Sequence, residues 1–85
     1  MRKCTHAQKV NILRACWRWV KLDHGHRVLP PHNDVFDPCC NAARDVRALD
    51  MDCIVDLLTG EERRRYDVGR IRSLERIFAT IEMKD

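Results

Sequence analysis

The feature that most constrains this chain is a predicted helix that is apolar around well over half of its circumference. Thr5 and Gln8 form a capping box, which predicts that a helix begins here and continues to about Leu22. At about 100° per residue, one apolar stripe contains Val10, Leu13, Cys16, Trp17 and Val20, and it is widened by Ile12, Ala15, Trp19 and Leu22. The remaining narrow polar strip carries Asn11, Arg14, Arg18 and Lys21. Such a helix must be covered on more than one side.

So short a chain offers few neighbouring helices against which that helix could be buried. The 85 residues correspond to one domain, and a domain of this size buries only a modest fraction of its surface. The economical solution is a second copy of the chain, or a foreign partner, against the Trp19 side. We therefore predict a homodimer whose contact is supplied by Ile12, Trp19 and Leu22.

Start and stop signals divide the rest of the chain into further helices. Asp37 followed by Pro38 is typical of a helix start, and Val35 and Phe36 are expected to fold back on that helix as a staple. Further starts are indicated by Asp50 before a helix over 51–58, by the capping box of Thr59 and Glu62, and by Asp67 before a segment that is helical nearly to residue 85.

The expected buried positions of these helices are Cys39, Ala42, Ala43, Val46, Leu49, Ile54, Val55, Leu58, Ile71, Leu74, Ile77, Phe78 and Ile81. No stretch alternates convincingly at a period of two residues, so we predict no sheet. The predicted fold class is all-α: one helical domain over residues 1–85, a small bundle of four to five helices that is dimeric.

The cysteines and the beginning of the sequence indicate a cytoplasmic protein. Five cysteines are an odd number, and no export signal follows the basic start, so we expect small buried side chains and no disulfide framework. No apolar run approaches the roughly 20 residues that cross a bilayer, so we expect no membrane partner.

Nine cysteines and histidines together require a zinc site to be considered. The best quartet would be His24, His26, His32 and Cys39. However, the sequence has no C-x-x-C pair, and neighbouring helical residues such as Cys39 and Cys40 point about 100° apart. We therefore expect solvated histidines and no metal.

Enzyme chemistry has little support in this sequence. Cys39 or Cys40 lies in a first helical turn with His32 as a conceivable base, but the carboxylate of Asp37 would oppose a thiolate there. The three glycines are isolated, so no phosphate-binding loop is present, and Ser73 is the only serine. We expect no enzyme, no cofactor and no small-molecule substrate.

Charge is segregated along the chain, which favours binding to a macromolecule. Residues 1–29 carry seven basic side chains against one acid, and residues 30–60 carry two against six. These surfaces can meet each other within or between subunits, or meet a charged partner. A protein partner would be contacted by Arg14, Arg18, Lys21, Arg63, Arg64 and Arg65, with Trp17 and Trp19 flanking Arg18.

In size and make-up, the chain resembles the small helical regulators carried by phages and other mobile elements. These include antirepressors and inhibitors of host defence, so the resemblance implies a regulator or inhibitor that occupies the surface of a target protein. The alternative is a small DNA-binding transcriptional regulator that uses Arg63, Arg64, Arg65, Arg70 and Arg72 against phosphates. Against it, these arginines are interleaved with acids, and a helix-turn-helix placed over residues 43–54 would have an acidic recognition helix carrying Asp52 and Asp56.

Overall fold

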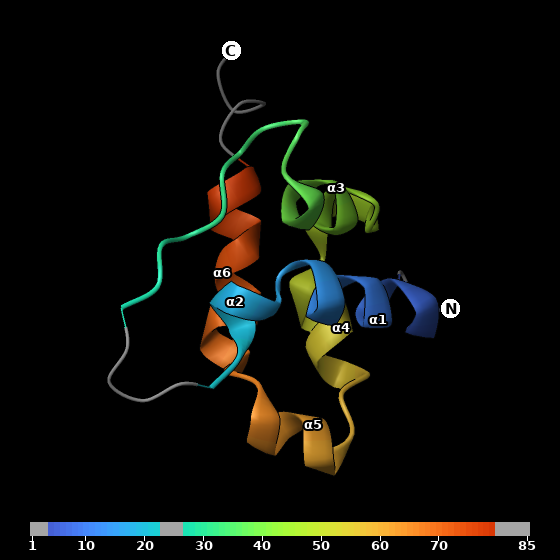
Figure 1. Ribbon diagram of the computed structural model, residues 1–85. Coiled ribbons are helices and arrows are strands. Elements are labelled where there is room, and N and C mark those ends of the chain that lie inside the picture. Colours follow the sequence, from blue (N-terminus) through green and yellow to red (C-terminus); the bar gives the residue numbers. More distant parts are fainter. Residues whose placement is uncertain (1–3, 23–26, 80–85) are drawn as a thin grey trace.

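The protein is all-α, as predicted, in a computed structural model that describes residues 4–22 and 27–79 (Figure 1). Over these residues it has the α-helices α1 (His6–Ala15), α2 (Trp17–Val20), α3 (Pro38–Arg44), α4 (Met51–Asp56), α5 (Gly60–Arg65) and α6 (Val68–Phe78), and the 3₁₀ helix η1 (Arg47–Leu49). The only strand-like pairing among them is an isolated bridge between Lys21 and Tyr66.

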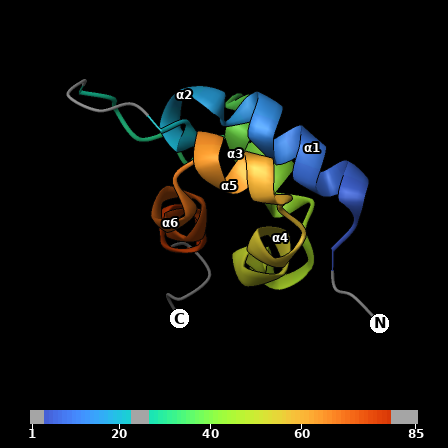
Figure 2. The same ribbon diagram turned by 90° about the horizontal axis from the view of Figure 1, so that it is seen from below.

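The helices pack around one core. α1 lies against α3, and α6 contacts α2, α3 and α4. Seen from below, α1 and α2 lie on one side, α4 and α6 on the other, and α5 crosses between them (Figure 2). The segment 27–37 returns from α2 to α3 without regular structure (Figure 1).

Local start signals place the helix beginnings where the sequence predicts them. Both capping boxes form, with reciprocal bonds between Thr5 and Gln8 and between Thr59 and Glu62. The side chains of Asp37, Asp50 and Asp67 cap α3, α4 and α6 by accepting hydrogen bonds from backbone N–H groups in each first turn. These contacts satisfy donors that a helix leaves unpaired at its start.

The first predicted helix is interrupted, so the described residues contain six α-helices instead of four to five. Cys16 has φ −102° and ψ 14°, and α2 begins after it. The predicted burial of the apolar stripe is partly wrong on both sides of this break. Ile12 is fully buried in the single chain, whereas Val10 and Trp17 are exposed by 37% and 48%.

The other expected core positions are largely confirmed. Ile71, Leu74 and Phe78 of α6 are fully buried against α4 and its neighbours. Leu49 is only partly buried, because α3 ends at Arg44 and the chain reverses through left-handed residues Ala48 and Leu49. Ile81 lies outside the described residues.

Two disulfides cross-link the bundle, which corrects the prediction that none forms. Cys4 is bonded to Cys53 of α4, and Cys16 is bonded to Cys39 at the start of α3, with Cα–Cα distances of 6.1 and 4.6 Å. The odd count is explained by Cys40, whose free thiol is buried. An odd number of cysteines was therefore a poor guide, because the fold brings four of them together in pairs.

A buried ion pair joins α1 to α5. The ammonium group of Lys9 lies 2.8 Å from a carboxylate oxygen of Glu62, and the Lys9 side chain is 1% exposed. The same ammonium group donates at 3.5 Å to the Leu57 carbonyl. Burial alone would raise the pKa of Glu62, but hydrogen bonds from Lys9 and Thr59 and the charge of Lys9 outweigh it and hold this pKa below its usual 4.5.

Candidate functional site

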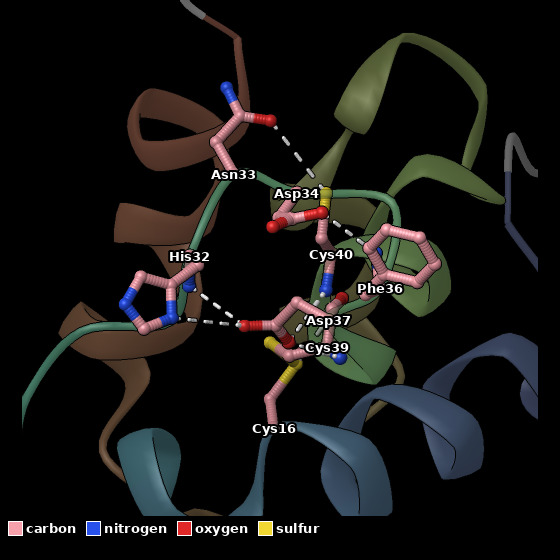
Figure 3. A network of polar contacts seen from close by, with 8 residues as sticks. All are labelled: Cys16, His32, Asn33, Asp34, Phe36, Asp37, Cys39 and Cys40. Carbon is pink, nitrogen blue, oxygen red and sulfur yellow. Dashed lines mark hydrogen bonds and ion pairs between the residues drawn. A yellow bond between two sulfur atoms is a disulfide. The ribbon is translucent and has the colours of Figure 1, made fainter.

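An open groove separates the α1–α2 junction from segment 27–37. Its volume is about 600 Å³, and both cysteines of the Cys16–Cys39 disulfide line it. Figure 3 shows this disulfide below the segment that carries His32, Asp34 and Phe36. The other lining residues are Arg14, Ala15, Trp17, Arg18, Trp19, Leu29, Pro31, His32, Asp34, Phe36, Asp37 and Pro38.

Beside the groove, Val35 and Phe36 form an exposed apolar tip, which we call the knob. Their exposures are 73% and 88%, so the predicted staple against α3 is wrong. The knob has a defined backbone conformation, because the N–H of Phe36 donates to the Asp34 carboxylate at 2.9 Å and the amide of Asn41 donates to the Val35 carbonyl at 2.8 Å. These two bonds hold the backbone of the turn, and the side chains of Val35 and Phe36 remain exposed.

Asp37 joins the knob to α3 and to the segment before it. One carboxylate oxygen accepts the backbone N–H groups of Cys39 and Cys40, and the other accepts the backbone N–H of His32 at 2.8 Å (Figure 3). The His32 imidazole lies 4.0 Å from the same carboxylate. A single N-cap side chain therefore orders the entry to α3 and one wall of the groove.

The opposite wall is basic. Arg14 and Arg18 have exposed side chains, and both line the groove. Among the described residues, no ion pair engages either guanidinium group. Lys21 lies on the Trp17 indole, with its ammonium group 4.3 Å from the ring centroid. The predicted partner-binding residues Arg14 and Arg18 thus lie in the same groove as the exposed Trp17.

The predicted dimer contact through Ile12, Trp19 and Leu22 does not form one exposed surface. Ile12 has no exposed area. The Trp19 indole N–H donates to Ser73 at 3.0 Å, and the guanidinium group of Arg70 lies 4.4 Å from the ring centroid, so this side chain is half-buried within the subunit. Leu22 alone is exposed, by 42%. The interruption at Cys16 places Trp17, and not Trp19, at the surface.

The predicted basic residues of α5 lie on a different element from the groove. Arg63 donates to the Val55 carbonyl at 2.9 Å, Arg65 lies 4.0 Å from Glu61, and Arg64 is exposed. The N–H of Leu22 donates to the Arg65 carbonyl, which places the end of α5 beside the end of α2.

Arg70 and Arg72, which the DNA-binding alternative also requires, make contacts within the chain. Arg72 pairs with Asp52 at 2.9 Å, and Arg70 stacks on Trp19 and donates to its carbonyl at 3.1 Å. These contacts reduce the number of guanidinium groups that α6 offers to a phosphate backbone.

Among the described residues, Cys39, Cys40 and His32 do not form the zinc site or the catalytic pair that the sequence analysis considered. Cys39 is in a disulfide, so it supplies neither a zinc thiolate nor a nucleophile. The buried thiol of Cys40 faces Asn33 and Arg44, with Sγ 3.7 Å from the side-chain oxygen Oδ1 of Asn33 and 3.3 Å from the Arg44 Nε. His24 and His26 lie outside the described residues.

One acidic cluster escaped the sequence analysis. Side-chain oxygens of Asp50, Asp52 and Glu75 lie within 4.8 Å of one another. Each carboxylate already has a structural partner: Asp50 caps α4, Asp52 pairs with Arg72, and Glu75 accepts the N–H of Met51 at 3.3 Å. The cluster is therefore accounted for by helix capping and an ion pair.

No protein-family model, curated protein or solved structure matches this chain. Within the described residues no helix is both long and apolar enough to cross a bilayer. The sequence signal for the knob was present in Asp34-Val35-Phe36-Asp37, two apolar residues between two turn-forming aspartates.

Proposed function

We propose that this protein is a non-enzymatic regulator or inhibitor that acts by binding another protein through the knob and the adjoining groove. The single observation that carries the proposal is the position of Phe36, an aromatic side chain that is 88% exposed on a turn held by its own hydrogen bonds. Removing such a side chain from water is a source of binding free energy, and the ordered turn lowers the entropy cost of doing so.

The surroundings of Phe36 support a protein partner. Trp17 and Leu29 are exposed and line the groove, and Val35 adjoins it in the knob. Aromatic side chains and arginine are enriched where proteins meet, and a group of exposed apolar side chains of this kind marks interaction sites. Arg14 and Arg18 at the edge of this surface would then steer the encounter.

A capture experiment with matched variants tests this proposal. The protein is immobilised and exposed to lysate of its native host, and bound proteins are quantified by mass spectrometry. We expect a specific partner whose recovery falls about tenfold or more with Phe36→Ser, because interface anchors of this type dominate binding. Leu22→Ser, a similar substitution outside the groove, is the control. Equal recovery with both variants would contradict the proposal.

The DNA-binding alternative makes a different prediction. A regulator that uses Arg63, Arg64 and Arg65 should bind duplex DNA with an affinity that falls steeply as salt increases. Fluorescence anisotropy with a labelled duplex, compared between the wild-type protein and the triple glutamine variant, distinguishes this alternative from a protein-binding function.

The homodimer and the cytoplasmic location remain predictions. The expected lack of disulfides no longer supports a cytoplasmic location, since the protein has two and disulfides persist in oxidising compartments. Acid quenching of host cells, followed by alkylation of the denatured protein and a mass measurement, tests it: a cytoplasmic protein is expected to be modified at Cys4, Cys16, Cys39 and Cys53.

A further inference from the structure

We infer that the knob and the groove are complementary to each other, so that a second copy of this chain seats on this face across a twofold axis. The inference rests on the proposed function, because it uses the same face, and it names a second copy as the occupant of that face when no other partner is bound. Its basis is that a protruding apolar tip and an apolar groove adjoin on one surface.

Shape is the first argument. In a twofold interface the same surface is used by both subunits, so a residue at one position meets a residue at another, and the reverse contact also forms. A knob beside a groove meets this condition. Phe36 of one copy enters the groove of the other copy beside Trp17, and Phe36 of that other copy enters the groove of the first. Both side chains lie on the rim or wall of one groove, which keeps the two contacts close to the axis.

Charge is the second argument. The α1–α2 wall carries the exposed cations of Arg14 and Arg18, and the opposite wall carries the exposed carboxylate of Asp34. The Asp37 carboxylate on that wall is mostly buried and already accepts backbone N–H groups. A twofold rotation brings the basic wall of one copy to the acidic wall of the other. The same pairing applies on a larger scale, since residues 1–29 are mainly basic and residues 30–60 mainly acidic.

Charge also favours a second copy as the occupant of the face in the isolated protein. A uniformly acidic partner would be opposed by Asp34, and a uniformly basic one would be opposed by Arg14 and Arg18. A second copy offers the opposite sign at both walls without any further requirement.

The required area is available in this small protein. A standard interface removes about 800 Å² from each partner, compared with a total accessible surface of 5919 Å² for the subunit. The knob, Trp17 and Leu29 would supply its apolar centre, as the hydrophobic cores of protein interfaces require.

Sedimentation velocity across micromolar concentrations tests the inference with the intact, disulfide-bonded protein. We expect a species of twice the 10.0 kDa chain mass. Phe36→Ser and Arg18→Glu should each weaken the dimer about tenfold or more, because both change the interface. Leu22→Ser and Arg76→Glu are matched controls at exposed positions outside the groove and should leave dimerisation unchanged within about twofold.

Two outcomes would overturn the inference: a monomer of 10.0 kDa throughout the concentration range, or a dimer that Phe36→Ser leaves intact. A monomer that captures a foreign protein through Phe36 would overturn the inference and preserve the proposed function. Loss of both the dimer and any Phe36-dependent capture would overturn both. Circular dichroism of each variant confirms that it remains folded, which is expected because the substituted side chains are exposed.

Discussion

Replacing Glu62 by glutamine is expected to destabilise this protein strongly, because it leaves the buried charge of Lys9 without its counterion. Lys9 is 1% exposed, and its ammonium group lies 2.8 Å from the Glu62 carboxylate. The only other contact recorded for that group among the described residues is the Leu57 carbonyl at 3.5 Å. Glutamine keeps the length of the side chain and its ability to complete the capping box with Thr59. The substitution therefore isolates the charge.

The expected cost follows from the burial of the two partners. Removing one member of a fully buried pair costs about 3–5 kcal/mol, and the 24% exposure of Glu62 lets water screen part of the charge, so we expect about 2–4 kcal/mol. This is a large share of the 5–15 kcal/mol, in round terms, that separates folded from unfolded small proteins. Lys9→Met, which removes the buried cation instead, should change the free energy of unfolding by about 1 kcal/mol or less.

The same pair predicts a dependence on pH. Because the folded pKa of Glu62 is lowered from 4.5, its contribution to stability is complete above that value and is lost as the pH falls through the folded pKa. The difference in stability between the wild-type protein and Glu62→Gln should therefore be constant near neutral pH and become smaller below 4.5.

Urea denaturation followed by circular dichroism, with the disulfides intact, measures all three proteins. The expected order of stability places Lys9→Met close to the wild type and Glu62→Gln well below both. If Glu62→Gln lost less than about 0.5 kcal/mol, which is the range of ordinary surface substitutions, the reasoning about the buried charge would be refuted.

Three further predictions concern the elements that frame the groove. Replacing Cys16 and Cys39 together by serine should cost about 3 kcal/mol in urea denaturation, since this disulfide spans 23 residues, and an unchanged midpoint would contradict this estimate. Asp37→Ala should lower the free energy of unfolding by about 1–2 kcal/mol in the same assay, because it removes the cap of α3. Asp37→Asn, which keeps a capping oxygen, should lower it much less. Asn41→Ala should accelerate hydrogen exchange at the knob by releasing the Val35 carbonyl, while global stability changes little; equal exchange would show that this bond does not order the knob.

Helix starts were predictable because their determinants are close in the sequence. The side chain of Thr5 bonds three residues ahead, and the side chain of Asp37 bonds two and three residues ahead. The spacing of apolar residues likewise sufficed to predict the all-α class, since they recur at helical spacing from Ile71 to Phe78 and no segment alternates at a period of two residues.

The features that determine the site depend on contacts between distant residues. The interruption at Cys16 coincides with a bond to Cys39, and it decides which of the two indoles is exposed. The outward direction of the knob depends on Asn41, whose amide secures the turn from within α3. Helical periodicity reports neither the Cys16–Cys39 bond nor the contact of Asn41. The predicted interface was therefore placed on the Trp19 side, whereas the exposed indole is that of Trp17.

The buried lysine illustrates the same limit. A charged residue in a basic segment is expected at the surface, and Lys9 lies in the interior because its partner is 53 residues away in the sequence. Only the folded arrangement of α1 and α5 reveals that pair.

The central contact proposed for this protein is that of the knob of one molecule with the groove of another. An isotope-filtered nuclear Overhauser experiment on an equal mixture of ¹³C-labelled and unlabelled protein tests this contact directly. We expect cross-peaks between the ring protons of Phe36 in one copy and the indole protons of Trp17 in the other. The absence of intermolecular cross-peaks between these two rings would contradict the proposed contact.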